Sequence, residues 1–254
     1  TPIVFTSRRT SELIKYAANA FLAMKITFIN EIADLCEAVD ADVQQVAKGI
    51  GLDNRIGGKF LHAGPGYGGS CFPKDTLALV RTATDAGSPV RLIETTVGIN
   101  DARKKAMAER IVRAMGGEVL GRTVGVLGLT FKPNTDDMRD SPSLDIVPAL
   151  QAAGAKVQAY DPEGHEARKM LADVDFRDGP YAVAEGADVL VILTEWDEFR
   201  ALDLDRVRDV MRRPLLVDLR NVYTPGEVAS RGFEYHSIGR PDAAPERTLR
   251  LAAQ

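Results

Sequence analysis

The chain is poor in the residues that build disulfide frameworks and metal sites. Its 254 residues include 2 cysteines and 3 histidines. Cys36 and Cys71 are too few to form a disulfide scaffold, which fits a reducing cytosol. The histidines lack the spacing of metal ligands and the neighbours of a catalytic triad. We therefore expect no metal site and no protease-like chemistry.

A long apolar run and an excess of positive charge are also lacking. No stretch approaches the roughly 18 apolar residues of a membrane span, so we expect no contact with a membrane. The formal net charge is −4, which gives no basic field to attract nucleic acid. No basic and apolar leader opens the chain at Thr1, so a cytoplasmic location is predicted.

What is present first is a helical region. Residues 11–39 are apolar around most of a helix circumference and contain no glycine or proline, which predicts one helix of roughly 40 Å. We expect this helix to be a spine between layers or subunits, and the interface of a homodimer. Further helices are predicted after Asp40 or Asp42, at 73–86 and at 90–115.

From Arg122 the pattern changes to alternating strands and helices. Buried parallel strands are predicted at 123–129, 156–160, 188–193 and 215–219, with a last strand near 233–238. Helices are predicted between them, near 142–153, 163–172, 181–186, 203–212 and 225–231. The expected fold is α/β: a helical central domain, residues 1–117, followed by a doubly wound Rossmann-like domain, residues 118–254.

The sharpest chemical feature is a glycine-rich segment that ends at a cysteine. Residues 64–75 read GPGYGGSCFPKD. Pro73 favours a helix start, so Cys71 should lie just before a helix N-terminus. The helix dipole and Lys74 favour a nucleophilic thiolate there. The alternative for Cys71 is a small buried residue in a tight loop, whereas Cys36, among apolar helix neighbours, is expected to be core.

The long helix carries a polar pair that its apolar surroundings do not explain. Lys15 and Asn19 are four residues apart and therefore share one helix face. A lysine buried among apolar residues usually needs a partner or a function. We expect both side chains to lie in the same site as Cys71.

The segment at 129–141 is longer than the roughly 2–6 residues of a usual βα loop. It carries Lys132 and Arg139 and lies at the carboxyl end of the first strand, where α/β sheets bind ligands. We interpret it as a phosphate-binding loop, with a solvated basic loop as the alternative. The preceding element at 125–128 is not the G-x-G-x-x-G fingerprint, which argues against NAD on this sheet.

Several of these segments resemble one known family. The run from Gly66 to Asp75 resembles the active-site signature of the UDP-glucose/GDP-mannose dehydrogenases. Residues 11–19 resemble the family's Lys–Asn helix motif, and residues 54–57 its substrate-binding arginine segment. Residues 128–142 and 218–221 resemble two nucleotide-binding strand ends, and the likeness runs from about residue 3 to 240. Residues 53–57 and 131–139 look most like the UDP-glucose-oxidising members.

The resemblance implies an oxidoreductase of polysaccharide biosynthesis that uses NAD to convert UDP-glucose to UDP-glucuronate in two hydride transfers. Cys71 would attack the intermediate aldehyde, and oxidation of the thiohemiacetal would give a thioester that water hydrolyses. Lys15 and Asn19 would stabilise oxyanions, and Asp75 would orient water and protons. The implied substrate-binding residues are Arg55, His62, Gly64, Gly66, Tyr67, Gly68, Phe131, Lys132 and Arg220. The implied cofactor-binding residues are Lys74 and Arg139.

The family holds most of its NAD on an N-terminal domain with a glycine fingerprint. The resemblance implies that this domain is missing before Thr1, so we expect this chain to be the cysteine and substrate-binding part, inactive alone. The sugar nucleotide could instead be GDP-mannose or UDP-N-acetylmannosamine. A nucleotide-binding module without chemistry, with a structural Cys71, is the third interpretation.

Overall fold

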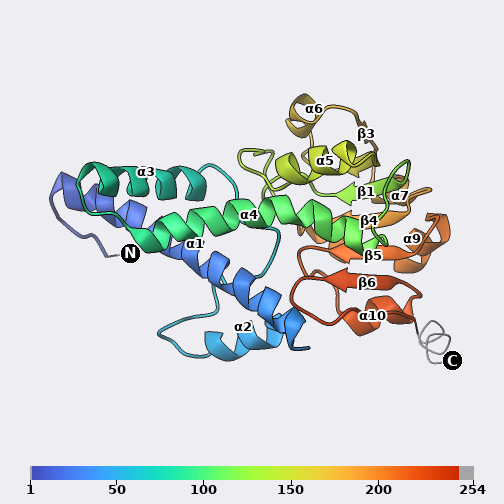
Figure 1. Cartoon of the computed structure of the whole chain (residues 1–254), viewed down its shortest axis with the longest axis horizontal. Helices are drawn as coiled ribbons and strands as arrows, with labels where there is room; N and C mark the ends of the chain where they lie inside the picture. Colours follow the sequence, from blue (N-terminus) through green and yellow to red (C-terminus); the bar gives the residue numbers. More distant parts are fainter. Residues whose placement is uncertain (1, 246–254) are drawn as a thin grey trace.

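The computed structural model describes residues 2–245, and their first part is helical (Figure 1). Helix α1 begins before residue 11 because the Ser7 hydroxyl accepts a hydrogen bond from Thr10 N–H and caps the helix. Asp42 caps the next helix in the same way, through Gln44 N–H. The helices of this part are α1 (Arg8–Ala38), α2 (Val43–Gly51), α3 (Phe72–Asp85) and α4 (Arg91–Ala114).

The second part is a six-stranded parallel sheet with the order β3-β2-β1-β4-β5-β6. The strand order reverses between β1 and β4, since the chain adds β2 and β3 on one side of β1 and then β4 to β6 on the other side. The carboxyl ends of β1 and β4 therefore flank a crevice. The strands are β1 (Thr123–Leu127), β2 (Lys156–Tyr160), β3 (Val174–Phe176), β4 (Val189–Ile192), β5 (Leu215–Asp218) and β6 (Glu234–Ser237). The helices are α5 (Ser143–Ala152), α6 (Ala167–Met170), α7 (Pro180–Ala184), α8 (Asp197–Arg200), α9 (Leu204–Val210) and α10 (Pro225–Ser230).

This arrangement confirms the predicted fold class, a helical region followed by a doubly wound α/β sheet. Two elements were not predicted. Strand β3 has only 3 residues at the sheet edge, none of them fully buried, so it leaves no apolar run in the sequence. Helix α8 is a single turn of 4 residues, too short for a helical period to show.

Alternate residues of the strands face two separate cores. Val189 and Val191 pack on one face of the sheet with α5, while Leu190 and Ile192 pack on the other face with α7, α9 and α10. The strand β4 is apolar at every position because helices cover both faces of the sheet, as is typical of parallel sheets.

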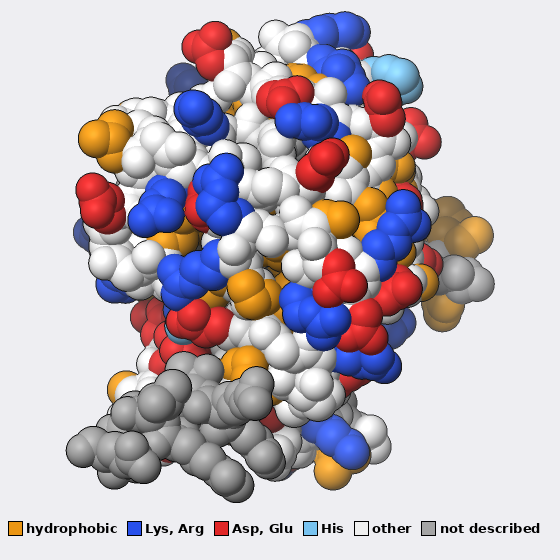
Figure 2. All heavy atoms as spheres, turned by 90° about the vertical axis from the view of Figure 1, so that its right-hand side faces the viewer, with side chains coloured by type: hydrophobic (Ala, Val, Ile, Leu, Met, Phe, Trp, Pro, Cys, Tyr) orange, Lys and Arg blue, Asp and Glu red, His pale blue; other side chains and the backbone are white. Residues whose placement is uncertain are grey.

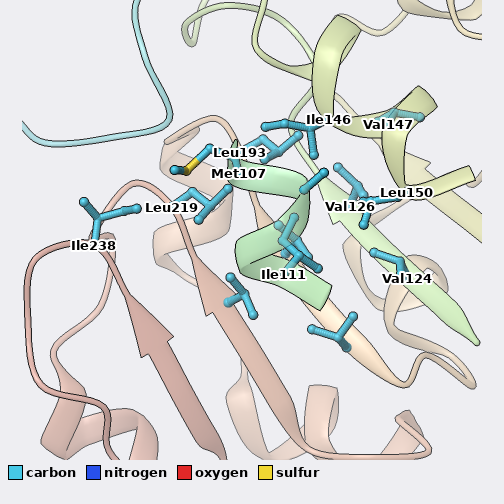
Figure 3. Packing of buried hydrophobic residues seen from close by; sticks show 14 of the residues in the cluster. Met107, Ile111, Val124, Val126, Ile146, Val147, Leu150, Leu193, Leu219 and Ile238 are labelled. Carbon is cyan, nitrogen blue, oxygen red and sulfur yellow. The ribbon is translucent and has the colours of Figure 1, made fainter. Parts of the chain in front are cut away.

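Helix α4 completes the first of these cores. Met107 and Ile111 lie beside Val124 and Val126 of β1 and the apolar face of α5 (Figure 3). Ile111 is fully buried, although it precedes the predicted boundary at 117. The division into domains 1–117 and 118–254 stays a prediction, and residues 246–254 lie outside the described part. Wherever that boundary is placed, α4 packs both against the other helices of the first part and in the core of the sheet.

Helix α1 buries mostly small residues and exposes several large ones. Ala20 and Ala23 are at most 1% exposed where α1 packs against α3 and α4. Phe21, Phe28 and Leu35, spaced by seven residues, are 56%, 47% and 56% exposed. A seven-residue spacing keeps side chains on one side of a helix, so these residues form an apolar stripe along α1.

The surface of the sheet part is of mixed charge. Basic and acidic side chains are interspersed over the side that carries α7 and α9 (Figure 2). Within residues 2–245, no helix combines the length and apolar character needed to cross a bilayer.

The position of Ile111 predicts that α4 is part of the stability of the sheet. We expect Ile111→Ala to lower the free energy of unfolding by about 2–5 kcal/mol, because it leaves a cavity between α4 and β1. The exposed Lys105→Ala on the same helix should change it by less than about 0.5 kcal/mol. Urea denaturation of both variants checks this, and equal effects would show that α4 does not contribute to the sheet core.

Candidate active site

Cys71 stands at the junction of the glycine-rich segment and α3. It is the N-cap residue of α3, with Pro73 in the first turn, and its side chain is exposed. The Ser70 Oγ lies 3.7 Å from the Cys71 Sγ. Cys36, in contrast, is 3% exposed in the apolar core, and burial raises the pKa of its thiol. The two cysteines therefore have opposite environments.

Asp75, one turn into α3, gathers the polar residues that surround the start of that helix. Asn19 Nδ2 donates to Asp75 Oδ2 at 2.6 Å, and Lys74 Nζ donates to Oδ1 at 2.6 Å. Lys15 Nζ lies 3.7 Å from Oδ2. Burial raises the pKa of the Asp75 carboxyl, but these partners outweigh it and the net pKa is lowered. Lys15 and Asn19 thus meet at the helix that Cys71 begins.

The loop after β1, residues 128–142, packs directly against the glycine-rich segment. Gly69 N–H donates to Arg139 O at 2.7 Å. A Cβ at Gly68 would lie 2.1 Å from Asp140 O, and one at Gly69 would lie 2.6 Å from the Phe131 ring. Gly69 also has a φ of +83°, which favours glycine. Only residues without side chains allow the two backbones to approach this closely.

Between the two loops lies a cavity of about 390 Å³, here called the inter-loop pocket. It brings together most of the residues predicted to bind substrate. Its lining is Ile26, Lys59, Phe60, His62, Gly66, Tyr67, Gly68, Phe72, Phe131, Lys132, Glu195 and Arg220. Gly64 lies at its border, since a Cβ there would be 3.3 Å from Arg220 Nη1.

Arg220 is held firmly at this pocket. Its Nε has a single hydrogen, which is donated to Leu193 O at 2.7 Å, and Nη2 donates to Phe131 O at 3.3 Å. Glu195 Oε2 lies 3.1 Å from Nε, an ion-pair distance, but accepts no hydrogen bond. The guanidinium therefore connects the ends of β1 and β4.

The turn that carries Arg220 is fixed from below by a buried carboxylate. Asp218 is fully buried and accepts hydrogen bonds from the backbone N–H groups of Arg220, Val222 and Tyr223. Tyr235 Oη donates to the same carboxylate at 2.8 Å. Burial raises the pKa of Asp218, against the effect of these donors.

Three predicted residues lie elsewhere. Arg55 is 89% exposed at its side chain, pairs with Asp53 at 2.6 Å, and lines a hollow beside α1 rather than the inter-loop pocket. Lys74 and Arg139 are exposed cations outside the pocket, paired with Asp75 at 2.6 Å and with Asp137 at 2.9 Å. The hydrogen bond to Asp75 and, to a smaller extent, Cys71 raise the pKa of Lys74. Asp137 and then Cys71 do the same for the pKa of Arg139.

Sequence reasoning missed several pocket residues. Lys59 and Phe60 precede the glycine-rich segment without a motif of their own, and Phe72 follows Cys71. Glu195 comes three residues after β4, at the carboxyl edge beside β1. The rule that ligands bind at this edge could have identified Glu195, whereas nothing in the sequence marked Lys59 or Phe60.

The sheet itself does not fit a dinucleotide. In dinucleotide-binding sheets an acidic residue after the second strand binds a ribose hydroxyl. Asp161 holds that position after β2, but its Oδ2 accepts from Leu129 N–H at 2.6 Å, Thr130 N–H at 3.0 Å and Trp196 Nε1 at 3.3 Å. The carboxylate is thus used to shape the loop after β1. Within residues 2–245, no group of three or more His, Cys, Asp or Glu could hold a metal ion.

Two models of one family match the chain. Residues 9–102 match the central domain of the UDP-glucose/GDP-mannose dehydrogenase family, and residues 125–225 match its UDP binding domain. These ranges contain Cys71 and Asp75 in the first case, and Lys132 and Arg220 in the second.

Individual relatives are similar over nearly the whole chain. The UDP-glucose 6-dehydrogenase of Rhizobium meliloti is 68% identical over 95% of this chain, and TuaD of Bacillus subtilis is 49% identical over 94%. A solved UDP-glucose dehydrogenase from Pyrobaculum islandicum superposes with a TM-score of 0.84, at 35% identity over 95% of this chain. The chain spans only 56%, 52% and 54% of these three proteins. Since both family models match in order and the fold agrees, the chain belongs to the UDP-glucose/GDP-mannose dehydrogenase family.

Proposed function

We propose that this chain is the cysteine and substrate-binding part of an enzyme that oxidises UDP-glucose to UDP-glucuronate. The observation that carries the proposal is the contact of Gly68 and Gly69 with the loop after β1, which places the Cys71 segment against the inter-loop pocket. Curated relatives named UDP-glucose 6-dehydrogenase, up to 68% identical, support this choice of substrate. The free thiols of Cys36 and Cys71 fit a reducing compartment, which supports a cytoplasmic enzyme.

Cys71 would act on the aldehyde that the first oxidation of the sugar alcohol produces. Its thiolate sulfur bonds to the aldehyde carbon while the carbonyl oxygen takes up a proton, which gives a thiohemiacetal. Removal of a hydride and a proton from this adduct leaves a thioester. Water then adds to the thioester carbon and gives up its two protons to solvent, the C–S bond breaks, and the carboxylate and the free thiolate are released. The exposed position of Cys71 at the start of α3 supports this role.

Around this carbon, Lys15 and Asn19 would stabilise negative charge on the oxygen, and Asp75 would orient water and protons. Lys15 Nζ and the second amide hydrogen of Asn19 can donate to an oxyanion while Asp75 holds both side chains. A fully buried carboxylate with three cationic or amide partners stays ionised, and can orient a hydrolytic water. Asp75 would therefore act in two ways: it positions Lys15 and Asn19, and it orients the water itself.

The inter-loop pocket would hold the sugar nucleotide. Lys59, Lys132 and Arg220 supply three positive charges and Glu195 one negative charge, and the remaining two match the two charges of a diphosphate. Phe131 and Tyr67 offer aromatic faces. Arg55 stays a predicted substrate ligand, although its side chain lies outside this pocket.

NAD, when bound, accepts the hydrides of this reaction class. The sheet of this chain does not fit it, because the fingerprint is lacking and Asp161 is already bonded. The exposed side chains of Lys74 and Arg139 carry positive charges that would pair with phosphates of a dinucleotide held outside the inter-loop pocket. Their cofactor role is a prediction.

Two other functions remain as proposals of lower rank. A solved UDP-D-ManNAc dehydrogenase from Pyrococcus horikoshii is 29% identical with a TM-score of 0.76, so a different sugar on the same nucleotide, or GDP-mannose, is the nearest alternative. A binding module without chemistry is the second, and it requires an unreactive Cys71.

A homodimer through α1 is also proposed. The stripe of Phe21, Phe28 and Leu35 is exposed, and beside it lies a hollow of about 420 Å³ lined largely by apolar side chains. An apolar stripe of this spacing is typical of helices that pack against a partner.

The first test is thiol reactivity. In the folded chain at neutral pH, iodoacetamide should label Cys71 more than about tenfold faster than Cys36, because a buried thiol reacts only after local opening. The raised pKa of Cys36 adds to the difference by leaving less thiolate. Peptide mass mapping over time measures both rates, and Cys71→Ser should remove the fast phase. Faster labelling of Cys36 would rule out Cys71 as the nucleophile.

The second test is ligand binding. UDP-glucose titrated calorimetrically should bind, and Arg220→Ala should weaken it about 10- to 100-fold by removing charge-assisted hydrogen bonds. Arg200→Ala removes the same charge from an exposed site outside the pocket and is the matched control. GDP should compete less than UDP, and no NADH should form from the chain alone. Stronger competition by GDP than by UDP would favour GDP-mannose, and NADH at a normal enzymatic rate would contradict the proposed division of the enzyme.

The third test concerns the α1 stripe. We expect the chain to sediment as a dimer at micromolar concentration and Phe28→Glu to sediment as a monomer, because the new charge would be buried at the interface. Met170→Glu places the same charge at a 52% exposed apolar residue of α6 and should leave the dimer intact. A monomeric unaltered chain would contradict the proposed interface.

A further inference from the structure

The glycine-rich segment is held in shape by buried side chains of α1 and α4. Gly64 N–H donates to Asn30 Oδ1 at 2.8 Å, and Gly64 O accepts from Arg103 Nε at 2.7 Å. Tyr67 N–H donates to Asn100 Oδ1 at 2.8 Å, and Tyr67 O accepts from Asn100 Nδ2 at 3.1 Å. Both main-chain polar groups of both residues are therefore satisfied by side chains.

Asn100 is the most specific of these partners. Its single amide group pairs with the N–H and the C=O of one residue, as a neighbouring strand would. It is 3% exposed, and a Cβ at Gly66, where φ is +120°, would lie 3.0 Å from its Oδ1. The backbone from Gly66 to Tyr67 is thus fitted closely around the Asn100 amide.

The helix that carries Asn100 is itself anchored at two places. Arg103 Nη1 pairs with Asp34 of α1 at 2.8 Å, and Met107 and Ile111 lie in the sheet core. Helix α4 is therefore a fixed support against which the segment from Gly64 to Gly69 is bound.

We propose that Asn100 is a positioning residue that sets the wall of the inter-loop pocket for the sugar nucleotide. The inference rests on the proposed function. Tyr67 and its two flanking glycines line the pocket together with Phe131 and Arg220. Among residues 2–245, the structure gives residues 64–70 one backbone–backbone hydrogen bond, from Gly69 to Arg139. Without Asn100, the peptide groups of Tyr67 would have to find other partners, and the pocket wall would change with them.

The test replaces Asn100 without changing its size. Asn100→Asp keeps one acceptor for Tyr67 N–H but turns a second oxygen toward Tyr67 O. We expect the Kd for UDP to rise about tenfold, which corresponds to about 1.4 kcal/mol. Repulsion between the second oxygen and Tyr67 O should push the peptide group away from residue 100, so exchange of the Tyr67 amide hydrogen, followed by NMR, should become faster in the same variant. Asn100→Ser, too short to reach both groups, should do the same if the aspartate variant does not fold.

A core variant of the same helix separates positioning from stability. Ile111→Val lowers stability at the sheet end of α4, and Ile111 is not among the residues that line the pocket. It should leave the Kd for UDP and the Tyr67 amide exchange within about twofold of the unaltered chain. An unchanged Kd in a folded Asn100 variant, or an equal loss in Ile111→Val, would overturn the positioning role. Failure of the unaltered chain to bind UDP would instead overturn the proposed function.

Discussion

The close approach of two backbones at Gly68 and Gly69 is the constraint on which the site depends. Residues from the helical part and from the sheet part form one pocket only because the glycine-rich segment lies directly against the loop after β1. With a Cβ at Gly68, 2.1 Å from Asp140 O, the two loops would have to separate. The glycines therefore provide contact between chain segments, in addition to conformational freedom.

Two buried carboxylates fix the backbone segments that form the sheet side of this pocket. Asp161 accepts the amides that start the loop carrying Phe131, and Asp218 accepts the amides of the turn carrying Arg220. Each acid sits at the carboxyl end of a strand, where a Rossmann-like sheet usually offers polar groups to a ligand. Here they bind the chain itself. The sheet thereby becomes a scaffold that presents basic and aromatic side chains toward the helical part.

The sequence predicted the elements with strong periodicity and the segment around Cys71, because glycine, proline and apolar spacing act locally. It also predicted that Lys15 and Asn19 share a face, but not that Asp75 would hold both. Contacts such as Asn100 with Tyr67 depend on how α4 packs, which no local pattern encodes. The exposed position of Arg55 is likewise a tertiary property, since its spacing from Gly57 does not determine where the segment lies.

Because α4 packs in both parts of the chain, it also affects how the protein unfolds on heating. Its sheet end is buried with β1, while its middle holds the glycine-rich segment through Asn100 and Arg103. Loosening of the sheet would release the helix, and with it the wall of the pocket. The two parts should therefore lose structure in one cooperative transition, and a ligand bound only in the pocket would protect the distant strands from heat as well.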